Sequence, residues 1–492
     1  MDRREFIKLS AGTAALAAFC SCSTLTAEST KKKRPNVILL LVDDMGYGDI
    51  AAHGNPVIKT PNFDKLHGES ARFTNFAVSP SCSPTRAALL TGKHEFLSGV
   101  THTIIPMREM SLKSTIIPQL FKKKGYKTGL FGKWHLSQAG EFGPWHRGFD
   151  ETLTVPKDSQ KSHYNPTLLK NQVETKFKGY RTDILFTEAM DFIKRHKNTP
   201  FFCYLPTYSP HSPHKVPQKY SKPYEVYVKD RKNENQRVGS GFLGMVANVD
   251  QNLGRLRTHL RSLGLEDNTL LIVINDNGGT GGIDIFNAGC RGVKGTIWSG
   301  GTRAYSFWKW GDKFAPGDRS QMSGHVDVLP TLADLCGHEI SEDLQKQLEG
   351  DSLRPVLEDA NARLEENRMQ VHSLGRWSNP LSWREHKYAA VSVRWKDYTL
   401  VRIDPCENGK CNTCSAIRNR IPRGRFKLSY TNNPDHHAIP APGQWSLYDI
   451  ATDPFQRTDI ADKHPEIAKR MANHYEAWWK KVEVVLTERW KE

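Results

Sequence analysis

Residues 36–44, NVILLLVDD, form a continuous run of apolar side chains that ends in two acidic residues. Residues 269–279, TLLIVINDNGG, repeat this design, with an aliphatic run that ends in Asn, Asp and Asn. Apolar runs without alternation are typical of strands that are buried on both faces of a parallel sheet. Two further runs, KTGLFGKWH (127–135) and PFFCYLPTYSPHSPH (200–214), lead in the same way to lysine and histidine residues. We therefore predict four buried strands with polar residues at their carboxyl ends.

Helix-like segments lie between these runs. Thr60 precedes Pro61 in a pair that is typical of a helix start. Residues 181–196 and 246–264 carry apolar side chains at helical spacing. Strands that alternate with helices indicate an α/β fold with a large mixed, mostly parallel sheet flanked by helices. In such a fold sites form beyond the carboxyl ends of the strands, where all four polar clusters fall.

The sequence changes character after about residue 367. Residues 387–403 and 444–454 read as alternating strands, and residues 465–490 as an amphipathic helix. We predict a smaller C-terminal α+β subdomain with an antiparallel sheet. The expected division of the chain is an export signal (1–30), a catalytic domain (31–367) and the C-terminal subdomain (368–492).

The first thirty residues have the pattern of an export signal. Arg3 and Arg4 precede an apolar, alanine-rich stretch, as in a twin-arginine signal. Cys22, which follows that stretch, is a candidate for lipid attachment and hence for a membrane-anchored lipoprotein. We expect an exported protein of the periplasm or cell envelope.

The chain of 492 residues is basic, with 69 Lys and Arg against 53 Asp and Glu and a net charge of +16. For an exported protein this surplus indicates a polyanionic substrate or surface, or else simply a solvated basic face. No nucleic-acid partner is expected, because no zinc finger, helix-turn-helix or RNA-binding motif is present. The sequence does not specify the oligomeric state.

Seven of the nine cysteines lie beyond the signal. Cys406, Cys411 and Cys414 cluster within nine residues. We expect a local disulfide loop here rather than a zinc site, because no histidine is close in the sequence and the protein is exported. Their pairing stays open.

Acidic and amide side chains end two of the predicted strands. Asp43 and Asp44 end one, and Asp276 and Asn277 end another. Carboxylates that are brought together repel one another unless a cation neutralises them. Oxygen donors suit calcium or magnesium, whereas helix capping is the alternative explanation.

The stretch SCSPTRAALLTG (81–92) places a cysteine ahead of a short helix. Pro84 suits a first helical turn and Gly92 a helix end. Cys82 would then lie at a helix N-terminus, where backbone N–H groups favour negative charge, with Arg86 one turn on. This arrangement predicts an anion site that contains a thiol.

Together these motifs resemble the sulfatase family of the alkaline phosphatase-like superfamily. The pattern C-x-P-x-R followed by AALLTGK stands in the expected order with VDDMGYGD, GKWHL, NDNGG and RGVKGTIWSGGTR between about residues 35 and 310. The resemblance implies that a maturation enzyme oxidises Cys82 to formylglycine, whose hydrated form attacks the sulfur of a sulfate ester and then expels sulfate.

The resemblance also implies roles for particular residues. Calcium is expected in preference to magnesium. Arg86 and Lys133 hold the formylglycine, and His135 assists sulfate release as a base. His211 and Lys294 grip the sulfate and assist protonation of the leaving group, with His214 as the alternative to His211. The implied metal ligands are Asp43, Asp44, Cys82 after its modification, Asp276 and Asn277.

We therefore expect a calcium-dependent sulfatase that acts on a sulfated sugar of a glycan or polysaccharide. Trp145, His146, Arg147 and His102 are candidate sugar contacts. One alternative is a phosphoester or phosphonate hydrolase of the same superfamily. The other is a sulfated-glycan-binding protein in which Cys82 is unmodified.

Overall fold

The computed structural model describes residues 34–158, 162–228, 239–404, 406, 414 and 441–491. Residues 34–492 form one compact unit. The expected export signal, with Arg3, Arg4 and Cys22, lies outside the described residues, and so does Cys411. Among the described helices, none has the length and apolar character that a membrane span requires.

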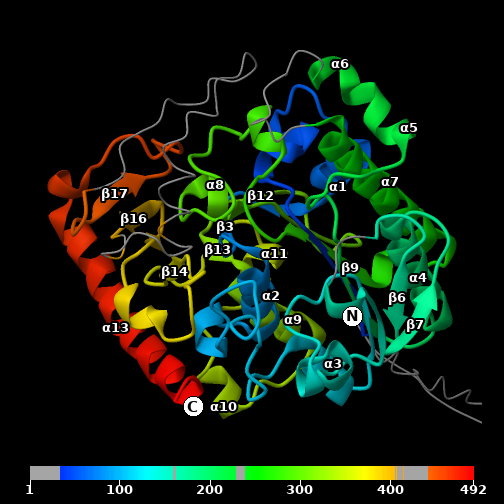
Figure 1. Cartoon of the computed structure of the whole chain (residues 1–492), viewed down its shortest axis with the longest axis horizontal. Helices are drawn as coiled ribbons and strands as arrows, with labels where there is room; N and C mark the ends of the chain where they lie inside the picture. The colour runs from blue at the N-terminus through cyan, green and yellow to red at the C-terminus, as the bar shows by residue number, and fades with distance from the viewer. Residues whose placement is uncertain are drawn as a thin grey trace, which may run out of the picture. The chain divides into compact units, whose positions relative to one another are not determined.

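A large sheet runs through the centre of this unit (Figure 1). Within the described residues it has ten strands in the order β12-β2-β11-β9-β1-β8-β4-β5-β6-β7. The four strands predicted from the apolar runs are its four central neighbours and pair in parallel. They are β9 (Thr269–Asn275), β1 (Asn36–Val42), β8 (Phe201–Pro206) and β4 (Lys127–Phe131).

The outer strands make the sheet mixed. β11 is antiparallel to both β9 and β2, and β5, β6 and β7 form an antiparallel meander at the other edge. The structure thus confirms the expected mixed, mostly parallel sheet. The outer strands are β12 (Gly317–Arg319), β2 (Ala71–Phe73), β11 (Ser306–Trp310), β5 (Glu151–Thr154), β6 (Thr167–Lys170) and β7 (Val173–Lys176).

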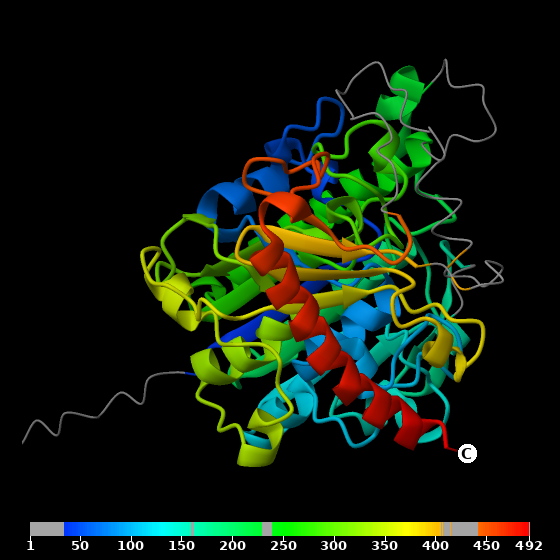
Figure 2. The same cartoon turned by 90° about the vertical axis from the view of Figure 1, so that its left-hand side faces the viewer.

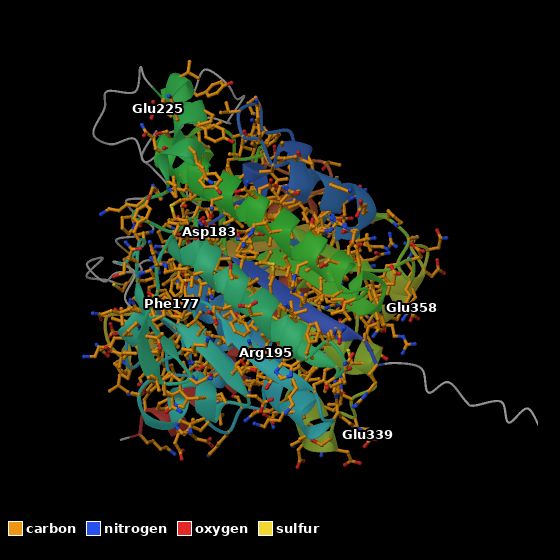
Figure 3. All side chains as sticks on the ribbon, turned by 90° about the vertical axis from the view of Figure 1, so that its right-hand side faces the viewer. Phe177, Asp183, Arg195, Glu225, Glu339 and Glu358 are labelled. Carbon is orange, nitrogen blue, oxygen red and sulfur yellow. The ribbon has the colours of Figure 1, made fainter. Side chains whose placement is uncertain are left out.

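Both faces of the sheet are covered by helices, which is why its central strands are mostly apolar. Val37, Leu39 and Leu41 of β1 share one hydrophobic core with α2, α3 and α9. The alternate residues of β1 share the opposite core with α1, α4 and α7. Figure 3 shows α7 beside α4, which carries the labelled Asp183 and Arg195. The six helices are α1 (Pro61–Glu69), α2 (Cys82–Thr91), α3 (Ile117–Lys123), α4 (Arg181–Arg195), α7 (Ser240–Ser262) and α9 (Val328–Cys336).

The C-terminal part of the chain adds a second, antiparallel sheet, as predicted. Figure 2 shows the terminal helix α13 (Pro465–Arg489) lying across its strands. Val391, Val393 and Leu400 share a core with Trp478 and Trp479 of that helix. The strands, in sheet order, are β14 (Gln370–Ser373), β15 (Val391–Trp395), β16 (Tyr398–Arg402) and β17 (Ser446–Asp449).

Several short elements complete the described chain. Three of them, β10, β3 and β13, form a small third sheet in that order. The short elements are β3 (Phe76–Ala77), β10 (Arg303–Ala304), β13 (Ser323–Gly324), α5 (Gln218–Ser221), α6 (Glu225–Val228), α8 (Ser299–Thr302), α10 (Glu342–Gln345) and α11 (Arg354–Glu358).

Candidate active site

Acidic residues meet at the carboxyl ends of β1 and β9. The two strands pair in register up to Val42 and Asn275, so the residues that follow them are neighbours. The Asp44 N–H donates to Asp276 Oδ1 over 3.1 Å, and Asn277 Nδ2 donates to Asp44 Oδ1 over 3.0 Å. Asp44 adopts a left-handed φ of +65°, which takes the chain sharply out of the strand. We call Asp43, Asp44, Asp276 and Asn277 the oxygen cluster.

Three cationic side chains pair with the oxygen cluster. Lys133 Nζ lies 2.8 Å from Asp43 Oδ2, and Arg86 Nη2 lies 2.7 Å from Asp276 Oδ2. Lys294 Nζ donates to Asp44 Oδ1. Arg86 and Lys133 are fully buried, so these ion pairs are shielded from water. Buried charges are tolerated when they are paired in this way.

The pKa values of the buried carboxyl groups shift in different directions. Burial by itself raises the pKa of Asp43, but Lys133, His211 and Arg86 hold it well below its ordinary value. The pKa of Asp44 is lowered too, because Lys294 and His211 outweigh the effect of burial. Burial and the neighbouring Asp43 instead raise the pKa of Asp276 well above its ordinary value. One more positive charge would therefore keep all three carboxylates ionised together.

The oxygen cluster fits a hard divalent cation. Asp43 Oδ1 and Asn277 Oδ1 are buried acceptor atoms without a hydrogen-bond partner among the residues that the structure describes, although Arg86 Nη2 lies 3.6 Å from Asp43 Oδ1. One possible ligand atom from each of Asp43, Cys82 and Asp276 lies within 4.8 Å of the others. Carboxylate and amide oxygens are the donors that calcium and magnesium prefer.

Cys82 is the first residue of α2 and is 2% exposed. Burial raises the pKa of its thiol, but Lys133 and Lys294 outweigh this effect and the net shift is downward. The helix ends at Thr91, and the next residue, Gly92, has a left-handed φ of +69° and lies too close to Leu348 and Leu329 for a Cβ. The expected helix, with its thiol at the N-terminus, is thus present.

The loop after β4 closes over this helix start. His135 Nδ1 lies 3.4 Å from Cys82 Sγ. Ser83 Oγ donates to the His135 carbonyl over 2.8 Å, and Arg86 Nη1 donates to the Lys133 carbonyl over 2.8 Å. These backbone contacts fix Lys133 and His135 relative to the first turn of α2.

The loop after β8 brings one of its two histidines to the oxygen cluster. His211 Nε2 lies 3.7 Å from Asp44 Oδ2, and His211 Nδ1 is 2.7 Å from the Ser212 carbonyl. Because a carbonyl can only accept, Nδ1 carries the hydrogen and Nε2 faces the carboxylate. The ring of His214 packs edge-on against Phe242, with 5.3 Å between centroids. The structure thus places His211 closer to the predicted site than its alternative.

Thr207 is a site neighbour that the sequence analysis missed. It follows β8 directly, its Oγ1 accepts from the Asp43 N–H over 3.3 Å, and it donates to the Ser209 carbonyl over 2.7 Å. Its position directly after an apolar run that ends at Pro206 is the sequence pattern that could have identified Thr207.

The structure corrects two of the expectations. Arg147 is not a sugar contact, because it is buried and donates to the carbonyls of Met110, Ser111 and Ser114. The preference for a disulfide loop over a zinc site rested on the distance of histidines in the sequence, and this distance does not hold in space. His386 lies beside both Cys406 and Cys414, although it is 20 and 28 residues away from them in the sequence.

Comparisons with known proteins identify the family and the fold to which the chain is similar. The Sulfatase family model matches residues 35–338. The chain is 29% identical to the uncharacterized sulfatase YdeN of Escherichia coli (strain K12), over 91% of this chain and 86% of that protein. It is 30% identical to human arylsulfatase A, over 68% of this chain and 69% of that protein. The crystal structure of Ps i-CgsB in complex with k-i-k-neocarrahexaose matches with a TM-score of 0.74 and 23% identity, over 91% of this chain and 93% of that one.

Proposed function

The chain belongs to the sulfatase family of sulfuric ester hydrolases, and we propose that it hydrolyses the sulfate ester of a sulfated sugar, using calcium and a formylglycine made from Cys82. The observation that carries this proposal is the placement of Cys82. The Cys82 Sγ lies 3.4 Å from His135 Nδ1. Burial raises the pKa of the Cys82 thiol, but Lys133 and Lys294 outweigh burial and lower it. A buried side chain among cationic groups and metal-type oxygen donors suits attack on a sulfate group.

We assign the calcium to the oxygen cluster. The ion would be held by side-chain oxygens of Asp43, Asp44, Asp276 and Asn277, two of which accept no hydrogen bond within the described part of the chain. When bound, calcium polarises sulfate oxygens and favours ionisation of a neighbouring hydroxyl group. Lys133 and Arg86 keep Asp43 and Asp276 oriented through ion pairs of 2.8 Å and 2.7 Å.

Residue 82 is held for its reaction by the surrounding side chains. Hydrated formylglycine at this position would supply one hydroxyl to attack sulfur and a second whose deprotonation would allow sulfate to leave. His135 Nδ1 is within reach of the residue 82 side chain and would accept that second proton. The N-terminus of α2 and the Lys133 ammonium stabilise negative charge at this position.

His211 and Lys294 would act on the leaving group. His211 Nε2 and Lys294 Nζ both face Asp44 and so lie at the same small region. Donation from Nε2 requires that His211 carries hydrogens on both ring nitrogens, since Nδ1 already donates to the Ser212 carbonyl. In that region both side chains would donate to sulfate oxygens and to the ester oxygen, on which charge accumulates as the S–O bond breaks. Protonation of that oxygen releases the sugar as an alcohol.

A sulfated carbohydrate is the substrate class that the remaining observations favour. The net charge of +16 attracts polyanions, and Ps i-CgsB, which shares the fold, was crystallised with a neocarrahexaose. We further propose export through Arg3 and Arg4, with lipid attachment at Cys22 as the anchored alternative, and a maturation enzyme as the partner that modifies Cys82. Replacement of both arginines by lysine is expected to block export, and export that persists would contradict this proposal.

Turnover of matched aryl sulfate and aryl phosphate esters tests the proposed reaction. Protein that has been produced together with a maturation enzyme should cleave the sulfate ester much faster. Faster cleavage of the phosphate ester would favour the phosphoester or phosphonate hydrolase instead. Absence of both activities, with sulfated-glycan binding retained, would favour the binding protein.

A further inference from the structure

A second group of metal-binding side chains lies in the C-terminal part of the chain. His386, Cys406 and Cys414 each offer one ligand atom, and these atoms all lie within 4.8 Å of one another. His386 and Cys414 are buried, and Cys406 is half-buried. We call these three residues the thiol cluster.

The hydrogen bond of His386 fixes which ring nitrogen can bind a metal. His386 Nδ1 lies 2.6 Å from the Ser382 carbonyl oxygen. A carbonyl oxygen only accepts, so Nδ1 carries the hydrogen and the lone pair resides on Nε2. Histidines that bind metals characteristically donate their other ring N–H to a carbonyl or carboxylate in this way.

The two sulfur atoms are close but are not bonded to each other. Cys406 Sγ and Cys414 Sγ are 3.3 Å apart, which exceeds the ~2.05 Å of a disulfide bond. Ligand atoms ~2.3 Å from a tetrahedral zinc ion would be roughly 3.8 Å apart, so a small movement would suffice. The Cys406 N–H also lies 3.1 Å from Cys414 Sγ and stabilises a thiolate there.

We propose that His386, Cys406 and Cys414 bind a structural zinc ion. Two thiolates and one imidazole are a donor set that selects zinc over calcium or magnesium. Binding replaces the two thiol protons, which are released to solvent. We assign these three ligands and leave the fourth tetrahedral position unassigned.

The site would connect segments that are distant in sequence. His386 follows Ser382–Glu385, and Cys406 follows strand β16. Lys387, which follows His386 in the chain, pairs with Glu476 of α13 over 2.6 Å. Tyr475 of the same helix donates to the Lys387 carbonyl. The zinc would therefore fix the segment on which the terminal helix rests, and its loss should lower stability.

Metal analysis of the purified full-length protein tests this inference. We expect about one zinc per chain in the wild type and its loss from the His386→Gln and Cys406→Ser variants. Cys336→Ser, a change at a buried cysteine in another part of the chain, is the matched control and should retain zinc. The two cluster variants should melt at lower temperature than the control while their sulfate-ester turnover stays within about threefold of the wild type.

Three results would overturn the inference. They are a wild-type protein without zinc, zinc that persists in the His386→Gln variant, and a Cys406–Cys414 disulfide in peptides that were alkylated without reduction. If the variants do not fold, the zinc-depleted wild type is titrated with Co²⁺. A thiolate-to-cobalt charge-transfer band is then expected, and its absence would likewise overturn the inference.

Discussion

The oxygen cluster and the thiol cluster bring metal-binding side chains together in different ways. In the oxygen cluster three of the four donors are acids, and the chain places Lys133, Arg86 and Lys294 against them. In the thiol cluster the donors are neutral until thiol protons are lost, so the fold can close around them without such cations. The oxygen cluster is therefore stabilised by ion pairs within the chain, whereas we propose that the thiol cluster is stabilised by its bound metal ion.

This difference leads to opposite expectations for metal removal. The oxygen cluster keeps its ion pairs when calcium is absent. Removal of calcium should therefore affect turnover more than folding. The thiol cluster should lose stability when zinc is absent, with little effect on turnover.

The largest expected effect is that of Cys82→Ala. Because this change removes the side chain that becomes the proposed nucleophile, kcat should fall at least about 10³-fold. Zinc content and melting temperature should remain as in the wild type, since the alanine stays at the start of α2. Turnover measurements beside the Cys336→Ser protein provide the check. Activity that survives the alanine substitution would remove Cys82 from the mechanism.

The next largest effect is expected for Asp43→Asn. Loss of this charge leaves the buried Lys133 without its ion-pair partner and removes a calcium ligand, so turnover should fall by about 10² or more. The matched control is Asp49→Asn, because Asp49 is buried on the same loop and accepts from the Gly46 N–H over 2.7 Å. Calcium content and turnover are measured for both proteins. Equal behaviour of the two would contradict the assignment of Asp43.

A smaller effect is expected when the two histidines after β8 are compared. His211→Asn should lower turnover by about 10²-fold, because the side chain near Asp44 would no longer donate to the leaving group. His214→Asn should change it by less than about threefold, since that ring packs on Phe242. Steady-state kinetics on one sulfate ester compares the two, and a larger loss for His214 would reverse the assignment.

The last prediction concerns stability rather than turnover, and it is a pH dependence due to Asp49. Burial raises the pKa of Asp49 to about 7, and the Gly46 N–H offsets this only in part. The folded state therefore holds a proton that the unfolded state releases above about pH 4. The free energy of unfolding should fall as pH rises from about 4 to about 7, by at most ~1.4 kcal/mol per pH unit.

Urea unfolding at several pH values tests this dependence. Asp49→Asn should remove the part of the decline that Asp49 contributes, because asparagine does not titrate, whereas the part due to other buried acids such as Asp276 should remain. Asp43, whose pKa the cations hold well below its ordinary value, should contribute none of it over the same range. An identical pH profile for the wild type and the Asp49 variant would show that Asp49 is ionised in the folded protein.

Residues of the oxygen cluster could be found from the sequence because each one directly follows an apolar strand. Parallel pairing of β1 with β9 then brings Asp43 and Asp276 together without further information. The start of α7 was missed by six residues, since Ser240, Gly241 and Gly244 oppose a helix in isolation. In the fold a Cβ on Gly244 would lie 2.8 Å from the Ser221 backbone nitrogen, so glycine allows α5 to approach.

The thiol cluster could not be found in this way. His386 and Cys406 belong to segments that only the folded antiparallel sheet brings together, and no periodicity relates them. Arg147 was misjudged for a similar reason, because the three carbonyls that it binds come from residues more than thirty positions earlier in the chain. Local sequence patterns predicted the residues at the strand ends. The surroundings of His386, Cys406 and Arg147 instead depend on contacts between distant segments of the fold.

The most direct test of the proposed function is mass spectrometry of the tryptic peptide 73–86, from protein produced in its native host or with a maturation enzyme. We predict that Cys82 has lost its sulfur and two hydrogens and gained one oxygen, which is the change from cysteine to formylglycine. An unmodified thiol in protein from the native host would contradict the account.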